Sequence, residues 1–520
     1  MVSLKGGSRI SRVLVMDMGG KLTQHVARKV REKGVYSEIL PCGANREEIK
    51  NKKASAVILC GGPETVKREI TELPDMEAIT GSGRPVMGIG YGIIPLIESL
   101  SGDIAGEAEG YDTAENAFEE KINPTAVFDI WGASSSGFSS SWVLPYRFGL
   151  PENWEVLATS VGGTPVAASS PDRKYWVYSF LPPEEILDGI VDFFLFKASG
   201  LVSNWNPSSL VEQTVEEISN TVGDNEQAVC GLSGGIDSAV SALLVHRAIG
   251  KRLTCIFVDH GLLRQGEAEE VISTFRDKFD LNLVSVDASD EFLERLKGVS
   301  SPEEKRKIIG NHFIDVFERE ARKLDNVRYL VQGTIYPDII ESISPSGHTI
   351  KSHHNVGGLP ENMNLKLIEP VKELFKDEVR KVGKALELPH EMVWRHPFPG
   401  PGLAVRVLGE VTQERLEITR QANAIVEEEV KKEGLYYYLW QAFAVLPEMK
   451  SVGISGDRRT YAYPVIIRAV TSRDAMTAKW YLFSREFLDR LSQRLVEEIP
   501  QVNRVAYDVT SKPPSTIEWE

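Results

Sequence analysis

Cysteine is scarce in this chain, which has four among 520 residues: Cys42, Cys60, Cys230 and Cys255. No two of them form a C-x-x-C pair, and each lies among apolar neighbours. This spacing does not resemble a disulfide framework, and it predicts buried, reduced thiols.

Long apolar runs are also missing, and so is an excess of positive charge. The first twenty residues have too short an apolar run for a signal peptide, and no uncharged run approaches the length of a membrane span. We therefore expect a cytoplasmic protein with no membrane partner. Lys and Arg number 59 against 74 Asp and Glu, a net charge of −15, which argues against a broad nucleic-acid surface. A local basic pocket for one small phosphate remains compatible with this charge.

The apolar and charged fractions, 42% and 26%, are ordinary for a globular chain, and the length predicts two to four domains. Residues 1–200 alternate β-rich runs (12–19 and 54–63) with an amphipathic helical pattern (23–34), which predicts a parallel sheet with helices on both faces. The Asn-Pro and serines in "ASGLVSNWNPSSL" indicate a boundary near residue 200.

A second alternating region follows, with buried strands such as residues 228–232, and runs to a Pro/Gly-rich junction at 395–404. Beyond the junction, a helix around 412–434 and strands at 462–472 and 503–511 predict a small α+β unit. The predicted fold class is therefore α/β, with two doubly wound parallel-sheet domains and a small C-terminal domain. The expected domain ranges are 1–200, 201–395 and 396–520.

The strongest chemical signal is the turn Ser233-Gly234-Gly235-Ile236-Asp237-Ser238, directly after strand 228–232. Its glycines let a ligand approach the backbone, and the following helix turns its free N–H groups toward the turn, so we expect a bound anion. No lysine follows the glycines, so this is not the G-x-x-x-x-G-K-[ST] phosphate loop. Asp237 would repel a phosphate unless Mg²⁺ lay between them, which makes Asp237 the candidate metal ligand. The alternative is a Gly/Ser turn capped by an Asp.

This hexapeptide resembles the signature of the N-type ATP pyrophosphatases, and later blocks resemble the GMP synthetase family. Examples are "CIFVDHGLLRQGE" (255–267), "WRHPFPGPGLAVR" (394–406) and "YDVTSKPPSTIEWE" (507–520). The resemblance implies an ATP-dependent amination of XMP to GMP, through an adenyl-XMP intermediate, with release of AMP and PPi. It also implies ATP and Mg²⁺ as cofactors, and a homodimer formed through residues 396–520.

The resemblance assigns roles by matching position. It gives the ATP phosphates to Ser233, Gly234, Gly235, Asp237 and Ser238, the adenine to Val258, and XMP to Arg306, Asp338, Lys512, Thr516 and Glu518. Lys351, on a segment similar to the family's lid, would neutralise phosphate charge as a catalytic residue beside Asp237. His353 and His354 are adjacent and rarely face one point, so we expect phosphate contact or solvation there, not a metal site. The family usually has Asn where this chain has His260.

Taken without the family, these positions have plainer interpretations. The basic run at residues 305–307 reads as a solvated helix face, Asp338 as a turn or cap carboxylate, and the tail "SKPPSTIEWE" as a docked terminus held by Ile517 and Trp519.

Residues 10–200 resemble the class I glutamine amidotransferase domain, but the chemistry of its nucleophile turn is missing. The family's nucleophilic Cys falls on Gly90 in "MGIGYG", and its later His and Glu fall on Leu181 and Pro183. No His occurs between His25 and His246, so no base is available in any register. Glutamine hydrolysis needs a thiolate, a base and an orienting group. We therefore expect a scaffold domain without glutaminase activity, and a synthetase that uses free ammonia or ammonia from a separate glutaminase.

Two other functions remain open at this point. The chain could be another N-type pyrophosphatase, such as an NAD synthetase or a tRNA-thiolating enzyme, although the tail and the acidic net charge weigh against it. It could also be a non-catalytic nucleotide-binding regulatory protein, although the intact phosphate turn argues otherwise.

Overall fold

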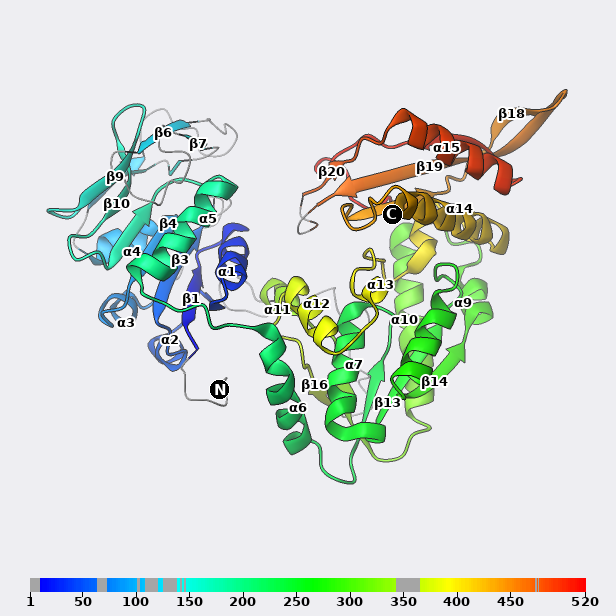
Figure 1. Ribbon diagram of the computed structural model, residues 1–520, viewed down its shortest axis with the longest axis horizontal. Helices are drawn as coiled ribbons and strands as arrows, with labels where there is room; N and C mark the ends of the chain where they lie inside the picture. Colours follow the sequence, from blue (N-terminus) through cyan, green and yellow to red (C-terminus); the bar gives the residue numbers. More distant parts are fainter. Residues whose placement is uncertain are drawn as a thin grey trace. The chain divides into compact units, whose positions relative to one another are not determined.

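The structure is a computed structural model that divides the chain into two compact units (Figure 1). One comprises Met1–Ser209 with Tyr336–Ser352, and the other comprises Leu210–Ile335 with His353–Glu520. The residues it describes are 10–62, 73–100, 103–107, 120–124, 138–140, 143–144, 146–342, 365–472, 475 and 477–520. The three-domain division expected from the sequence is finer than this and stays a prediction.

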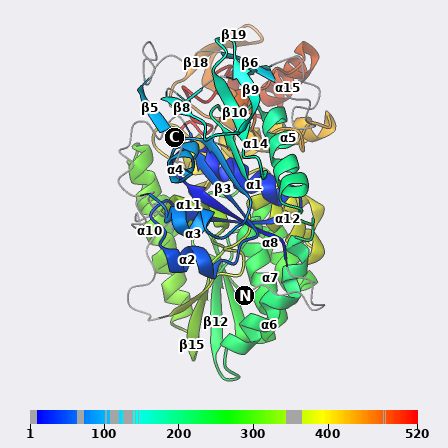
Figure 2. The same cartoon turned by 90° about the vertical axis from the view of Figure 1, so that its left-hand side faces the viewer.

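The first unit is built on a parallel sheet, as expected. Its parallel strands, in spatial order, are β2 (Tyr36–Pro41), β1 (Arg12–Asp17), β3 (Ala56–Gly61), β4 (Val86–Gly90) and β11 (Tyr175–Tyr178). Helices α1 (Leu22–Glu32) and α5 (Glu184–Asp192) cover one face of this sheet. The other face carries α2 (Arg46–Asn51), α3 (Met76–Thr80) and α4 (Ile93–Ser99), as Figure 2 shows.

The sheet continues beyond its parallel part, which the sequence pattern did not predict. Next to β11 lie the antiparallel strands β10 (Pro165–Ser169), β9 (Glu155–Ser160), β6 (Glu120–Pro124) and β7 (Phe138–Ser140). Short turns at 161–164 and 170–174 join consecutive strands, and such short connections permit only antiparallel pairing. A separate ribbon pairs β5 (Asp103–Glu107) with β8 (Tyr146–Gly149).

The second unit contains a five-stranded parallel sheet in the order β14 (Asn282–Asp287), β13 (Leu253–Asp259), β12 (Gln227–Gly231), β15 (Val327–Val331) and β16 (Lys366–Ile368). The expected strand, turn and helix are confirmed, since β12 leads through residues 232–235 into α7 (Ile236–Ile249). The other helices of this region are α6 (Leu210–Thr221), α8 (Glu267–Ile272), α9 (Ser289–Leu296), α10 (Pro302–Ala321), α12 (Lys376–Ala385) and α13 (His390–Val393). Parallel strands end at one edge of the sheet, which gathers the turns after β12, β13 and β15.

The C-terminal region forms the small α+β structure expected. Its sheet consists of β17 (Gln441–Val445), β18 (Ser451–Ser455), β19 (Arg458–Thr471), β20 (Lys479–Trp480) and β21 (Val502–Tyr507). Helices α14 (Gln413–Lys432) and α15 (Arg485–Glu498) supply apolar side chains to its core, among them Val426 and Leu491. A 3-10 turn, Gly402–Arg406, connects the junction to this region.

Within the part of the chain that the structure describes, no helix is both long and apolar enough to cross a bilayer. The cytoplasmic location stays a prediction.

Candidate active site

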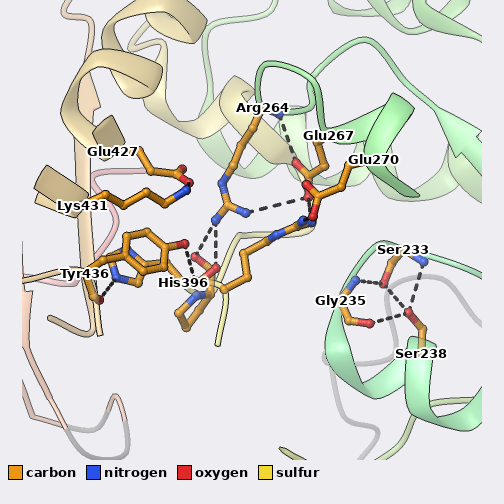
Figure 3. Close-up of polar contacts among 12 residues, drawn as sticks. Ser233, Gly235, Ser238, Arg264, Glu267, Glu270, His396, Glu427, Lys431 and Tyr436 are labelled. Atoms are coloured by element: carbon orange, nitrogen blue, oxygen red, sulfur yellow. Dashed lines mark hydrogen bonds and ion pairs between the residues drawn. The ribbon is translucent and has the colours of Figure 1, made fainter. Parts of the chain in front are cut away.

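The phosphate turn is held by hydrogen bonds among its own residues. Ser233 Oγ lies 3.0 Å from Ser238 Oγ, and Ser238 Oγ donates to the Gly235 carbonyl oxygen at 3.0 Å (Figure 3). Gly234 has φ +74°, a conformation that glycine adopts without strain. Ser233 and Gly235 are exposed, so the turn presents hydroxyls and the start of the 14-residue helix α7 to solvent. This arrangement can bind an anion.

Asp237 occupies the first turn of α7 with its two oxygens in different surroundings. Lys376 Nζ, on α12, donates to Asp237 Oδ2 at 2.5 Å. Asp237 Oδ1 is buried and accepts no hydrogen bond. A buried carboxylate oxygen without a donor beside an anion site fits a Mg²⁺ ligand, because Mg²⁺ prefers oxygen ligands shared with phosphates. Sequence reasoning missed Lys376, which lies 139 residues from its partner.

The end of β15 reaches the same place. A Cβ built on Gly333 would lie 2.9 Å from the Ser238 backbone nitrogen, so only glycine lets the chain pass the start of α7. Val258, near the end of β13, is 2% exposed and packs in the apolar core. The contact between Val258 and adenine stays a prediction. Because the Val258 side chain is buried, its backbone is the part that could make this contact.

The tail residue Glu518 lies in a network that sequence reasoning did not anticipate. Arg406 donates to both of its carboxylate oxygens, at 3.1 Å from Nε and 2.9 Å from Nη2. Gln441 Nε2 donates to Glu518 Oε1 at 3.0 Å. Arg406 is 3% exposed, so this two-point pair is rigid. The only sequence signal for Arg406 was its place at the end of the "PGPGLAVR" junction.

The basic run on α10 divides into one buried and two exposed side chains. Lys305 is completely buried, and its Nζ donates to the Val407 carbonyl at 2.7 Å and to Glu520 Oε2 at 2.5 Å. Burial lowers the pKa of Lys305, and the Glu520 carboxylate opposes that shift. Arg306 is exposed and donates to the Glu520 carbonyl oxygen at 2.5 Å. Lys305 and Arg306 therefore hold the last residue of the tail in place.

The main chain of the tail is also bound by Arg468, a fully buried side chain on β19. Its guanidinium donates to the carbonyls of Thr510, Thr516 and Ile517 at 2.9, 2.8 and 2.7 Å. Ile517 is buried, as the docked-tail interpretation requires.

The other tail side chains differ in how far they are fixed. Trp519 is 40% exposed and donates from Nε1 to Asp508 Oδ2 at 3.0 Å. Lys512 Nζ donates to the Ala475 carbonyl at 2.9 Å, and the exposed Thr516 hydroxyl donates to the Glu518 carbonyl.

A cavity of about 250 Å³ opens between α8, the junction and α14. Its five basic side chains are Arg264, Arg395, Arg406, Arg420 and Lys431. Each is paired with a glutamate, at 3.8, 3.2, 2.9, 2.6 and 2.7 Å in that order. The cavity is therefore close to neutral. His396 stacks on Tyr436 here, with ring centroids 3.9 Å apart, and burial lowers the pKa of His396 to about 4 (Figure 3).

The His260 substitution has a clear structural basis. His260 Nδ1 accepts a hydrogen bond from the Leu262 backbone N–H at 3.1 Å, the role that an Asn side-chain oxygen fills in an Asx turn. His260 is 7% exposed and its ring meets Phe292 edge-on, and burial lowers the pKa of His260 to about 4. The neutral ring thus preserves the turn.

The remaining predicted residues are Asp338 and three residues of the segment similar to the family's lid. Asp338 lies on α11 (Tyr336–Ser342), which belongs to the first unit. Lys351, His353 and His354 lie outside the described residues. Their roles stay predictions.

The first unit keeps the frame of a nucleophile turn between β4 and α4. A Cβ on Gly92 would lie 2.0 Å from the Leu59 carbonyl oxygen, and one on Gly88 would lie 3.0 Å from the Gly92 oxygen. Gly90, at the tip, has φ +61°. The flanking glycines are required by close backbone contacts, as in a strained strand-to-helix turn.

The groups that would complete a glutaminase site are occupied elsewhere or absent. Oxyanion donors in such sites come from the residue after the nucleophile and from the loop after a neighbouring strand. Here the Tyr91 N–H donates to the Gly61 oxygen and the Gly62 N–H to the Gly19 oxygen, both at 3.0 Å. The N–H groups of Tyr91 and Gly62 are therefore already used in hydrogen bonds within the backbone.

His25, the histidine of this region, forms a contact with a glutamate. His25 Nε2, on α1, lies 2.8 Å from Glu184 Oε2 on α5, and Leu181 and Pro183 stand where the resemblance places the catalytic His and Glu.

Family models match three parts of the chain. Residues 14–180 match "Glutamine amidotransferase class-I", residues 209–304 match "NAD synthase" and residues 428–519 match "GMP synthase C terminal domain". Among curated proteins, "GMP synthase [glutamine-hydrolyzing]" of Clostridium novyi (strain NT) is 50% identical over 514 residues. The protein of that name from Clostridium botulinum (strain Kyoto / Type A2) is 49% identical over 512 residues, and that from Halothermothrix orenii is 49% identical over 522. Each alignment covers 98% of this chain and 99% of the relative.

Proposed function

The chain belongs to the GMP synthase family, and on that premise we propose that it aminates XMP to GMP with ATP, using ammonia in place of glutamine. The C–N ligase activity follows from the family. The nitrogen source is inferred from Gly90, a tip with no side chain, in a turn whose frame is otherwise kept.

In the synthetase reaction, the turn Ser233–Ser238 holds the ATP phosphates through its N–H groups and hydroxyls. The 2-oxygen of XMP attacks the α-phosphate of ATP, and PPi leaves. The 2-oxygen, a poor leaving group by itself, can then leave as part of AMP. Ammonia then displaces AMP to give GMP. Glu518, fixed by Arg406 and Gln441, and the tail residues Lys512 and Thr516 are proposed to hold XMP.

Mg²⁺, when bound, would neutralise the phosphates and assist departure of PPi. Asp237 Oδ1 is the proposed ligand because it is buried and lacks a donor. Lys376, 2.5 Å from Oδ2, keeps the carboxylate oriented and adds positive charge beside the phosphates.

Ammonia is the proposed nitrogen donor because Gly90, Leu181 and Pro183 stand where the resemblance places the nucleophile, the base and its orienting group. A thiolate cannot form at Gly90, and His25 is engaged with Glu184. The relatives are named as glutamine-hydrolyzing enzymes, so the proposed use of ammonia would set this chain apart from them. Ammonia would be taken from solution or delivered by a separate glutaminase.

The test is PPi release by the purified chain with XMP and ATP, comparing ammonium with glutamine as donor. We expect turnover with ammonium and none with glutamine, and no glutamate formed. Equal use of both donors would refute the proposal for the first unit. Binding of ATP and XMP without PPi release would instead favour a regulatory nucleotide-binding protein.

The phosphate turn is tested by the substitution Asp237→Ala, which should abolish PPi release. Product formation at the wild-type rate would remove the phosphate turn from the mechanism.

We also propose that two copies associate through the C-terminal sheet. Residues 458–462 of β19 pair with β18, beyond the part of β19 that pairs with β17 and β21 (Figure 1). On this ribbon Val452, Ile454 and Tyr461 are 55, 81 and 69% exposed. Val452 and Ile454 share a face of β18, and Tyr461 lies opposite Val452. An exposed apolar two-stranded edge is a surface that proteins normally cover, here with a second copy.

A further inference from the structure

A buried carboxylate that the mechanism above does not use packs against the phosphate turn. Glu267 begins α8 and is 5% exposed. A Cβ built on Gly234 would lie 3.6 Å from Glu267 Oε1. This carboxylate therefore lies beside the backbone expected to hold the triphosphate, with no glycine side chain between them.

Two arginines fix the position of Glu267 (Figure 3). Arg395 Nη1 donates to Oε1 at 3.2 Å, and the Arg264 backbone N–H donates to Oε2 at 3.2 Å. Arg264 Nη1 adds an ion pair at 3.8 Å. A buried carboxylate held from both oxygens has little freedom to move.

The contacts continue from Arg264 to the tail. Arg264 Nη2 donates to the carbonyls of His396 and Pro397 at 2.9 and 3.4 Å. Gln441 Nε2 donates to the same Pro397 carbonyl at 2.8 Å and to Glu518 at 3.0 Å. One run of polar contacts, all inside the second unit, thus joins Glu267, beside the phosphate turn, to the residue proposed to hold XMP.

We propose that Glu267 is a positioning residue that sets the phosphate turn relative to Glu518, through Arg264 and the Pro397 carbonyl. This proposal rests on the function proposed above. Attack on the α-phosphate requires the reacting atoms to meet at about 3–3.5 Å, and an error of about 1 Å can cost about 100-fold in rate. Two substrates held by separate parts of the fold need such a fixed link.

Glu270 provides a matched control. It pairs with the other end of the Arg395 guanidinium, with Oε1 2.5 Å from Nη2, and its side chain is 43% exposed. None of its atoms lies within 4 Å of the Cβ built on Gly234. Glu267→Gln and Glu270→Gln therefore each remove one carboxylate charge beside Arg395, and only Glu267 also contacts Arg264 and lies beside Gly234.

For Glu267→Gln we expect kcat for PPi release to fall at least about tenfold, because the substrates no longer meet correctly. Its affinity for a non-hydrolysable MgATP analogue should weaken by a similar factor, while XMP binding alone stays within about twofold of wild type. Glu270→Gln should stay within about twofold on every measure. Steady-state kinetics and titration calorimetry on the full chain give these values.

Equal effects of the two substitutions, or a Glu267→Gln enzyme like wild type, would overturn the proposal. So would parallel loss of XMP and analogue binding, since that marks general damage to the fold. Arg264→Lys keeps the positive charge but cannot donate to both the His396 and Pro397 carbonyls. It should lower kcat and leave XMP binding normal. An unchanged kcat would show that positioning does not depend on the contact with Pro397. If the wild type releases no PPi from XMP, the proposed function fails, and analogue binding by the two Gln variants still decides the role of Glu267.

Discussion

Gly90 stands at the tip of a strand-to-helix turn whose flanking glycines are required by close backbone contacts. The contacts that require Gly88 and Gly92 are steric, and they persist whether or not the tip carries a nucleophile. A thiol at the tip would still lack a base, because Leu181 stands in that place. The N–H groups of Tyr91 and Gly62, which an oxyanion would need, already donate within the backbone.

We therefore expect Gly90→Cys alone to leave glutamate release from glutamine at background. Nucleophilic catalysis requires the base as well as the thiol. The measurement is a coupled glutamate assay, with ammonium-dependent PPi release as the control for an intact synthetase. Glutamate release above that of the unsubstituted chain would show that a base exists which the structure does not reveal.

His260 predicts a pH dependence of stability. Burial lowers its pKa from the ordinary value of 6.5 to about 4, so the unfolded chain binds the proton more readily than the folded one. The contribution of His260 to the free energy of unfolding is complete above about pH 6.5 and is lost as the pH falls toward 4. The loss is at most roughly 3–4 kcal/mol, at roughly 1.4 kcal/mol for each pKa unit. Thermal unfolding of the full chain between pH 7 and 4.5 measures it.

His260→Asn isolates that contribution. The Asn oxygen can accept the Leu262 N–H without titrating in this range, so the variant should lose less stability on acidification than the wild type. His396, whose pKa is also lowered to about 4, remains in both proteins and cancels in the comparison. Identical pH profiles would show that His260 carries none of the effect.

The candidate site was predictable from sequence where its residues are contiguous. Ser233, Gly234, Gly235 and Ser238 lie together because one turn contains them all. Lys376 and Gln441 could not be found this way, since they meet their partners across 139 and 77 residues of sequence.

At the scale of elements, α10 and the C-terminal tail act together. Lys305→Met should leave Glu520, whose side chain is 8% exposed, without its partner, and lower the free energy of unfolding by about 3 kcal/mol. The tail would then be held less firmly, and the Kd for XMP should rise about tenfold, or about 1.4 kcal/mol. Titration calorimetry with XMP and thermal unfolding measure the two effects.

Lys307→Met is the control for this change, because Lys307 lies on the same helix and pairs only at the surface, with Glu303 at 3.0 Å and both side chains over 70% exposed. It should alter neither quantity appreciably. If the two substitutions had the same effect on XMP binding, the buried pair would not be what holds the tail.

The elements themselves followed from sequence wherever a strong period was present. The helix at 412–434 and the turn before Ile236 are found within two residues of their predicted places. The antiparallel strands β9 and β10 were missed because alternation of strand and helix dominates that region, although the Gly162-Gly163 turn between them was a signal for a hairpin.

At the scale of the whole molecule, fold class and family were readable because many separated motifs occur in one order. The division of the chain into compact units was harder to predict from sequence. Helix α11 belongs to the first unit, although in the sequence it follows β15 of the second. Compactness depends on contacts between distant segments, and a linear boundary cannot express them.

The same scale gives the last prediction, the oligomeric state. The ribbon of β18 and residues 458–462 has too few strands to bury its own apolar face, so its exposure is stable only if another surface covers it. Ile454→Asp places a charge on that face and should shift the full chain from dimer to monomer in sedimentation velocity at micromolar concentration. Val202→Asp, at a side chain 62% exposed in the first unit, should leave the dimer intact. A wild-type chain that sediments as a monomer, or an Ile454→Asp variant that remains dimeric, would remove the ribbon from the interface.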